Sequence, residues 1–110
     1  MKQVLLIATG GTIACRETEN GLSPTLTGEE LRGLMPELNG ICSVGVSDLM
    51  NLDSTDLTAA DRAAIARTVW ENRGGYDGVV IAHGTDTLAY TAALLHHMLP
   101  NIDRPVVLTG

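Results

Sequence analysis

The stretch V-L-L-I-A-T-G-G-T-I-A, residues 4–14, gives the clearest indication of the fold. Its first half is short, continuous and apolar, as in a strand that is buried on both faces of a sheet. Gly10 and Gly11 then end the strand, because glycine adopts backbone conformations that other residues avoid. Thr12 follows directly and has two interpretations. It closes a turn, or it carries a catalytic hydroxyl at the carboxyl end of a strand, beside bare backbone N–H groups.

Strand and helix patterns alternate along the rest of the chain. Short apolar runs predict strands over residues 3–8, 41–47, 78–82 and 105–109. Capping boxes that begin at Thr27 and Thr58 predict two helices, and apolar spacing predicts a third over residues 88–99. Residues 15–26 are polar and contain an Asn-Gly and a Ser-Pro pair, which predicts a loop. This order indicates an α/β fold, Rossmann-like, with a mostly parallel sheet in three layers and helices on both faces.

At 110 residues the chain has room for one domain and no more. The last strand pattern runs into Gly110 with no helix pattern after it, whereas α/β units normally cover their strands with helices. We therefore expect residues 1–110 to be the N-terminal part of a larger α/β domain, with no second domain among them.

The composition excludes several classes of partner. The net charge is −6 and no run of Lys or Arg occurs, which argues against nucleic acid, whose binding needs a basic surface. No apolar run approaches the ~20 residues of a membrane-spanning helix, so no membrane partner is expected. The first apolar run is too short for an export signal, and a cytoplasmic location is expected. Cys15 and Cys42 fit no metal-binding spacing and are expected to be free thiols.

Three polar clusters follow apolar segments: residues 9–12, 53–56 and 83–87. Open α/β sheets bind ligands at the carboxyl ends of their strands, so we expect the three clusters to meet at one edge of the sheet. Together they supply hydroxyl groups, carboxylates and backbone N–H donors beside glycines. This combination suits nucleophilic attack on an acyl carbon, because the attack needs a hydroxyl, an activating group and donors for the oxyanion.

Each cluster also has a purely structural interpretation. Thr87 is a candidate N-cap for the following helix, with Asp86 beside it. Asp53 and Ser54 are able to make local side-chain turns. His83 fits a buried histidine with satisfied hydrogen bonds better than it fits a general base.

Cofactor and metal sites are not predicted. Residues 9–12 lack the third glycine of a dinucleotide-binding turn, and no lysine follows to make a phosphate-binding loop. Asp53, Asp56 and His83 are metal-ligand residue types, but no spacing enforces a ligand geometry.

Two stretches carry a resemblance to a known family. T-G-G-T-I-A at residues 9–14 is similar to the N-terminal signature of the bacterial-type L-asparaginases, and G-V-V-I-A-H-G-T-D-T-L at residues 78–88 resembles their second signature. L-D-S-T-D-L at residues 52–57 falls where that family places its substrate-carboxylate loop. The resemblance covers essentially the whole chain. It implies the N-terminal part of the asparaginase N-terminal α/β domain, with the family's smaller C-terminal domain outside these residues.

The same resemblance implies an activity and its catalytic residues. Thr12 matches the nucleophile, which attacks the side-chain amide carbon of L-asparagine to give an acyl-enzyme and ammonia. Thr85 matches the second catalytic threonine, and Asp86 matches its acidic neighbour. No cofactor is implied. The full-length protein is expected to be a homo-oligomer acting on a small molecule, L-asparagine or L-glutamine.

Substrate binding is also implied residue by residue. Ser54 matches the serine that binds the substrate α-carboxylate, and Asp53 and Thr55 line the same loop. Asp86 matches the residue that holds the α-ammonium group, beside Thr85.

Residues 15–26 match the family's mobile lid, and the sequence departs from the family pattern in two ways. Leu22 stands where the family usually has a tyrosine that hydrogen-bonds the nucleophile. The family's catalytic lysine lies downstream of the Thr-Asp pair, whereas Lys2 is the single lysine of this sequence. Residues 1–110 alone are therefore expected to bind substrate poorly and to turn it over negligibly.

Two other functions stay open from the sequence. One is a relative that acts on glutamine or on a tRNA-linked amide, because one methylene changes selectivity by only about 1–3 kcal/mol. The other is a non-catalytic amino-acid-binding domain that has the same loops.

Overall fold

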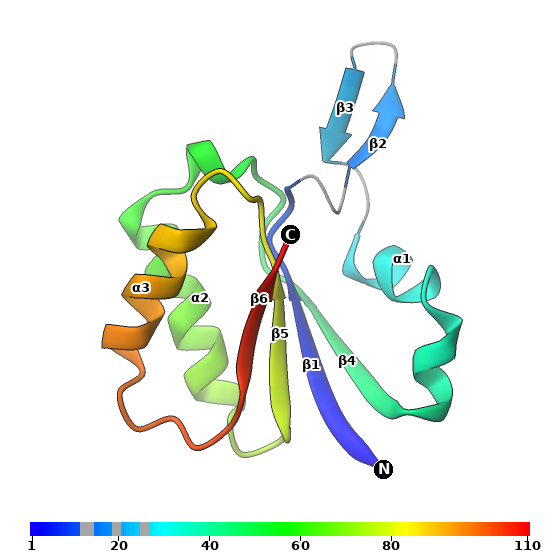
Figure 1. The fold of residues 1–110 in the computed structure, drawn as a ribbon, viewed down its shortest axis with the longest axis vertical. Helices are drawn as coiled ribbons and strands as arrows, with labels where there is room; N and C mark the ends of the chain where they lie inside the picture. The colour runs from blue at the N-terminus through cyan, green and yellow to red at the C-terminus, as the bar shows by residue number, and fades with distance from the viewer. Residues whose placement is uncertain (12–14, 19–20, 25–26) are drawn as a thin grey trace.

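The computed structural model describes residues 1–11, 15–18, 21–24 and 27–110. Within them, four parallel strands form the main sheet in the order β4-β1-β5-β6 (Figure 1). Their bounds are Lys2–Ala8 for β1, Cys42–Asp48 for β4, Gly78–Ala82 for β5 and Val106–Thr109 for β6. Each bound lies within one residue of the prediction. The predicted α/β fold with a parallel sheet is confirmed.

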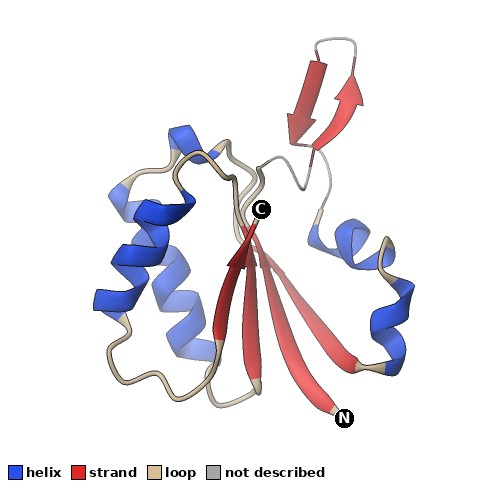
Figure 2. Ribbon diagram, in the orientation of Figure 1, coloured by secondary structure: helices blue, strands red, loops and turns tan. Residues whose placement is uncertain are grey.

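The helices begin where the capping boxes predicted. α1 spans Gly28–Gly33 after Thr27, and α2 spans Ala59–Asn72 after Thr58; both capping boxes are formed. α3 spans Leu88–Met98, and two short 3₁₀ helices, η2 and η3, span Pro36–Gly40 and Ser54–Asp56. Figure 2 shows α2 and α3 together on one side of the sheet and α1 on the other. No helix in the described ranges is long and apolar enough to span a membrane.

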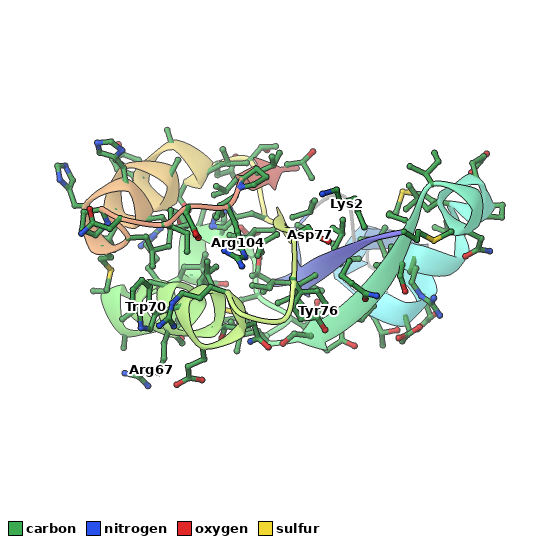
Figure 3. The ribbon with its side chains drawn as sticks, turned by 90° about the horizontal axis from the view of Figure 1, so that it is seen from below. Lys2, Arg67, Trp70, Tyr76, Asp77 and Arg104 are labelled. Atoms are coloured by element: carbon green, nitrogen blue, oxygen red, sulfur yellow. The ribbon has the colours of Figure 1, made fainter. Side chains whose placement is uncertain are left out.

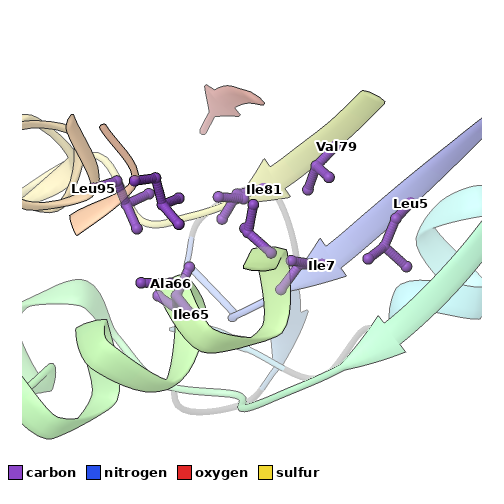
Figure 4. Close-up of a cluster of buried hydrophobic side chains, with 9 residues drawn as sticks. Leu5, Ile7, Ile65, Ala66, Val79, Ile81 and Leu95 are labelled. Carbon is purple, nitrogen blue, oxygen red and sulfur yellow. The ribbon is translucent and has the colours of Figure 1, made fainter. Parts of the chain in front are cut away.

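Alternate strand residues face opposite sides of the sheet, so the core has two halves. The two halves differ in size. Leu5, Ile7, Val79 and Ile81 pack against α2 and α3, where Ile65 and Ala66 of α2 face the strands (Figure 4). The other side holds a smaller cluster in which Leu6 packs with Leu31 of α1. Aliphatic side chains fill both halves, as expected from a sequence with 3% aromatic residues.

The loop predicted at residues 15–26 is wrong for residues 15–18 and 21–24, and residues 19–20 and 25–26 lie outside the described residues. β2 (Cys15–Thr18) and β3 (Gly21–Pro24) pair as an antiparallel hairpin with Thr18 opposite Gly21. The hairpin stands beyond the carboxyl ends of the main strands (Figure 1). Its composition is polar, but backbone hydrogen bonds between two strands do not require apolar side chains. Two residues separate the strands, which is the commonest length of a hairpin connection.

The chain leaves β1 in one direction and returns on its other side. From β1 it passes through α1 to β4, and from β4 it passes through α2 to β5, which pairs with the opposite edge of β1. Right-handed crossovers place α1 on one face and α2 on the other when the direction reverses. The carboxyl ends of β1 and β5 therefore form the topological switch point, where ligands bind in open α/β sheets.

Candidate active site

Backbone contacts join the ends of β1 and β5 at the switch point. The N–H and the hydroxyl of Thr9 both donate to the carbonyl of Ala82, at 3.0 and 2.6 Å. Gly10 and Gly11 follow with φ of 107° and 86°, in the left-handed region that favours glycine. A β-carbon on Gly11 would collide with the backbone N and Cα of Gly84. The Gly-Gly pair is therefore required by a close approach between two loops.

The loop after β4 meets the same point. The N–H of Leu52 donates to the carbonyl of Thr9 at 2.9 Å. A β-carbon on Gly84 would lie 2.8 Å from Cβ and 2.9 Å from Oγ of Ser54, so Ser54 fills the space that a side chain at position 84 would need. The structure thus brings together the described members of all three polar clusters. Thr12 lies outside the described residues.

Ser54 is buried and is held by Thr87 through two hydrogen bonds. The N–H of Thr87 donates to Oγ of Ser54 at 3.2 Å, and the hydroxyl of Thr87 donates to the Ser54 carbonyl at 2.8 Å. Because Oγ of Ser54 is an acceptor here, its own hydroxyl hydrogen is left to donate. No residue in the described ranges accepts it. Thr87 precedes α3 as predicted, but its side chain makes no capping bond, since it is used on Ser54.

Asp53 is engaged locally. Its Oδ1 accepts hydrogen bonds from the N–H and from the hydroxyl of Thr55, both at 3.0 Å, which caps η3. These two bonds, first the backbone and then the side-chain donor, hold the pKa of Asp53 below its ordinary value of 3.8. The predicted local side-chain turn is confirmed for Asp53. Both side chains are exposed and so remain reachable by solvent.

Thr85 and Asp86 form the exposed turn between β5 and α3. Neither side chain has a hydrogen-bond partner among residues 1–11, 15–18, 21–24 and 27–110, whereas Ser54, Asp53 and Thr87 nearby all have one. A hydroxyl and a carboxylate without internal partners are available to bind a polar ligand.

His83 is fully buried and both ring nitrogens are used. Nδ1 lies 2.6 Å from the carbonyl of Gly84, and Nε2 lies 2.8 Å from the hydroxyl of Thr91. A carbonyl only accepts, so Nδ1 donates and Nε2 accepts from Thr91. The interpretation of His83 as a satisfied buried histidine is confirmed.

Arg62 is a residue of this region that the sequence analysis did not identify. It lies in α2 and donates to the hydroxyls of Thr87 and Thr91, which belong to the turn and helix after β5. The local sequence gives no signal for it, because an arginine in an amphipathic helix usually faces solvent. Its role depends on how α2 packs beside α3.

Several other residues lie away from this edge or outside what is described. Lys2 begins β1 at the opposite, amino-terminal edge, which Figure 3 shows from below. Cys42 is a free thiol as expected, while the side chains of Cys15 and Leu22 are not among those described. The described residues include no group of three His, Cys, Asp or Glu side chains that could hold a metal ion.

Comparison with known proteins assigns the fold to a family. The family model described as "Asparaginase, N-terminal" matches residues 3–110. The chain belongs to the asparaginase family. The resemblance seen in the two signatures is thereby confirmed.

Similar proteins include enzymes with two different names. The L-asparaginase of Thermococcus kodakarensis is 42% identical over 98% of this chain and 33% of its own length. A glutamyl-tRNA(Gln) amidotransferase subunit of Pyrococcus abyssi is 45% identical over 100% of this chain and 26% of its own. L-asparaginase 1 of Escherichia coli K12 is 39% identical over 99% and 33%. The chain thus spans about a quarter to a third of the length of these curated relatives.

Solved structures of the family have the same fold. The thermostable L-asparaginase from Thermococcus kodakarensis superposes with a TM-score of 0.79 at 42% identity, and covers 98% of this chain and 33% of that one. The structure described as "Probable Cytoplasmic L-asparaginase from Campylobacter jejuni" gives 0.81 at 28% identity, over 98% and 32%.

Proposed function

We propose that the protein carrying residues 1–110 is an amidohydrolase that converts L-asparagine to L-aspartate and ammonia through a threonine acyl-enzyme. Residues 1–110 contribute part of its N-terminal α/β domain, and the whole enzyme is a homo-oligomer that works without a cofactor. One observation carries the proposal. Three loops with complementary polar groups meet in backbone contact at the switch point of an asparaginase-family fold.

Recognition of an amino acid needs a donor for its carboxylate and an acceptor for its ammonium group. Ser54 supports the first role, since its hydroxyl hydrogen has no acceptor in the described ranges and a carboxylate accepts strongly. Asp86 supports the second role, because its carboxylate has no described partner and is exposed. Asp53 and Thr55 line the same loop as Ser54, where the two bonds from Thr55 hold the Asp53 carboxylate in place.

Thr12 is proposed as the nucleophile. Its oxygen bonds to the amide carbon, the carbon–nitrogen bond breaks, and the hydroxyl proton reaches the leaving nitrogen so that ammonia departs. Water then cleaves the β-aspartyl ester. A threonine hydroxyl is weakly nucleophilic and needs an activating neighbour. Thr85 is proposed as the neighbouring catalytic hydroxyl, whereas Lys2 is excluded, since a seven-residue strand places it roughly 20 Å from this edge.

Ammonia release from L-asparagine tests the proposal in the protein that carries these residues. Thr12→Ala is expected to lower kcat about 10³-fold or more, as removal of a catalytic nucleophile does. Thr12→Ser keeps a hydroxyl and is the matched control, which retains measurable turnover. Full activity in Thr12→Ala would end the assignment of the nucleophile.

A second candidate function is favoured by the relative from Pyrococcus abyssi. That protein is named as part of a glutamyl-tRNA(Gln) amidotransferase and is 45% identical to this chain. The same site would then release ammonia for a tRNA-linked acceptor. Ammonia release that is faster from L-asparagine than from L-glutamine, and independent of added glutamyl-tRNA, supports the hydrolase. Binding of L-aspartate without any turnover would instead indicate an amino-acid-binding domain.

A further inference from the structure

The side chain of Arg62 makes three hydrogen bonds, two to threonines at the start of α3 and one to the residue after η3. Its Nε donates to the hydroxyl of Thr91 in α3 at 2.8 Å, and its Nη2 donates to the hydroxyl of Thr87 at 2.9 Å. Its Nη1 donates to the carbonyl of Leu57, directly after η3, at 3.2 Å. The planar guanidinium therefore joins α2 to the loop that carries Ser54 and to the turn that carries Thr85 and Asp86.

The hydrogen-bond directions form a consistent network. Each threonine hydroxyl accepts from Arg62 and donates onward, Thr87 to the carbonyl of Ser54 and Thr91 to Nε2 of His83. His83 in turn donates from Nδ1 to the carbonyl of Gly84. Every buried side-chain nitrogen and oxygen among the described residues has a partner. A satisfied network of this kind holds its members in one arrangement, because any shift leaves a buried polar group unpaired.

We propose that Arg62 is a positioning residue that fixes the distance between Ser54 and the Thr85–Asp86 turn, and so sets the length of amide side chain that the site accepts. This inference rests on the proposed function. In the proposed site Ser54 holds the substrate carboxylate and Asp86 holds its ammonium group. Thr85 of the same turn lies at the reacting amide, so the position of the turn relative to Ser54 sets how far along the side chain the amide must lie. A displacement of roughly 1 Å is enough to cost about 10²-fold in rate.

The geometry explains why an arginine is needed. A guanidinium presents five donors in a rigid fork and reaches three acceptors at once, whereas a lysine ammonium acts as a point charge on a flexible stem. Arg67, five residues along the same helix, makes a useful contrast. It is exposed, its side chain makes no hydrogen bond within the described ranges, and it points away from the sheet in Figure 3.

The test compares kcat/KM for L-asparagine and L-glutamine in the protein that carries these residues. We take the ratio of kcat/KM for L-asparagine to kcat/KM for L-glutamine. This ratio does not depend on the fraction of folded enzyme, so a merely structural role of Arg62 does not change it. Arg62→Met is expected to lower the ratio about tenfold, since one methylene is worth roughly 10- to 200-fold in a well-formed pocket. Arg62→Lys should fall between Arg62→Met and wild type, and Arg67→Met should leave the ratio unchanged. An unchanged ratio in Arg62→Met overturns the proposal.

Thr87→Val provides a second route that leaves Arg62 in place. It removes the hydroxyl that links Arg62 to Ser54, and it should lower the same ratio. In the double variant the two effects should be clearly less than additive, because both changes break one linkage. Additive effects would mean that Arg62 acts independently of this loop, which contradicts the proposal.

A binding measurement separates this inference from the proposed function. If the wild-type protein releases no ammonia from either amino acid, the proposed hydrolase fails. The ratio of the dissociation constants for L-aspartate and L-glutamate then measures the selection for side-chain length by binding alone, without a reaction. A shift in that ratio on Arg62→Met, absent in Arg67→Met, supports the positioning role. The same ratio in all variants, or no binding of either ligand, refutes it.

Discussion

Gly11 shows how one residue type is fixed by a contact far away in the sequence. Its φ of 86° and the approach of Gly84 leave no space for a β-carbon. The sequence predicted a turn at Gly10 and Gly11 from composition alone. It did not reveal that the neighbour is the loop after β5, because that contact depends on the pairing of β1 with β5.

Gly11→Ala should destabilise the fold by about 2–4 kcal/mol, since it combines backbone strain with a backbone collision. Thermal or chemical unfolding measures the change. Gly33→Ala is the matched control, because Gly33 has no atom within 4 Å of its would-be β-carbon, and it should change stability little. Equal stability of the two variants would contradict the close approach described here.

The pKa of the Asp53 carboxyl tests the two hydrogen bonds from Thr55. Two bonds from Thr55 lower its pKa, so Thr55→Val, which removes only the hydroxyl bond, should raise that pKa part of the way to 3.8. A carboxyl with a lowered pKa stabilises the fold above its unfolded pKa, and the contribution is lost as the pH falls through the folded value. A nuclear magnetic resonance titration of Asp53 gives the shift. Thr55→Ser should behave as wild type, and a pKa that stays put in Thr55→Val would rule out the hydroxyl bond.

Among the elements, local signals predicted the helices better than the hairpin. Capping boxes and apolar spacing lie within one helix, so they are readable from the sequence. The β2–β3 hairpin has polar strands with no face to bury in its sequence pattern, and its polarity was interpreted as a loop. The same limit hid Arg62, whose partners belong to other elements.

Thr58→Ala should cost about 1 kcal/mol, because it removes the hydroxyl that accepts from the N–H of Asp61 at the start of α2. Denaturant unfolding of the protein that carries these residues measures the loss. Thr58→Ser retains the acceptor and should stay within a few tenths of a kcal/mol. Equal free energies of unfolding for Thr58→Ala and Thr58→Ser would show that the capping box does not stabilise the fold.

At the scale of the whole fold, the two faces of the sheet differ in how many side chains they bury. The α2–α3 side holds the larger cluster of fully buried side chains. The α1 side holds the smaller cluster and has a hollow of about 430 Å³ bordered by apolar residues that include Leu6, Val44 and Val80. The other side has its own cavity of about 580 Å³ between α3 and β6. We therefore expect the side chains on the α2–α3 side to contribute most of the free energy of unfolding.

Val79 and Val80 test this difference with one substitution on adjacent residues of β5. Val79 is 3% exposed and belongs to the larger cluster, whereas Val80 is half-buried beside the hollow. Val79→Ala should cost about 2 kcal/mol and Val80→Ala about 1 kcal/mol or less, since less apolar area leaves water on the α1 side. Denaturant unfolding gives both values. A larger loss for Val80→Ala would show that the α1 side is the better packed.

The sequence by itself determined the strands of the sheet, the helix starts and the family signatures, because periodicity, capping and turn residues act over a few neighbouring positions. Only the tertiary structure decided which loops meet and which polar groups are engaged there. Strand order and right-handed crossovers bring Gly11, Gly84 and Ser54 together at the switch point. The bonds from Arg62 to Thr87 and Thr91 span 25 and 29 residues, and a hydrogen bond across that separation forms only after the helices have packed.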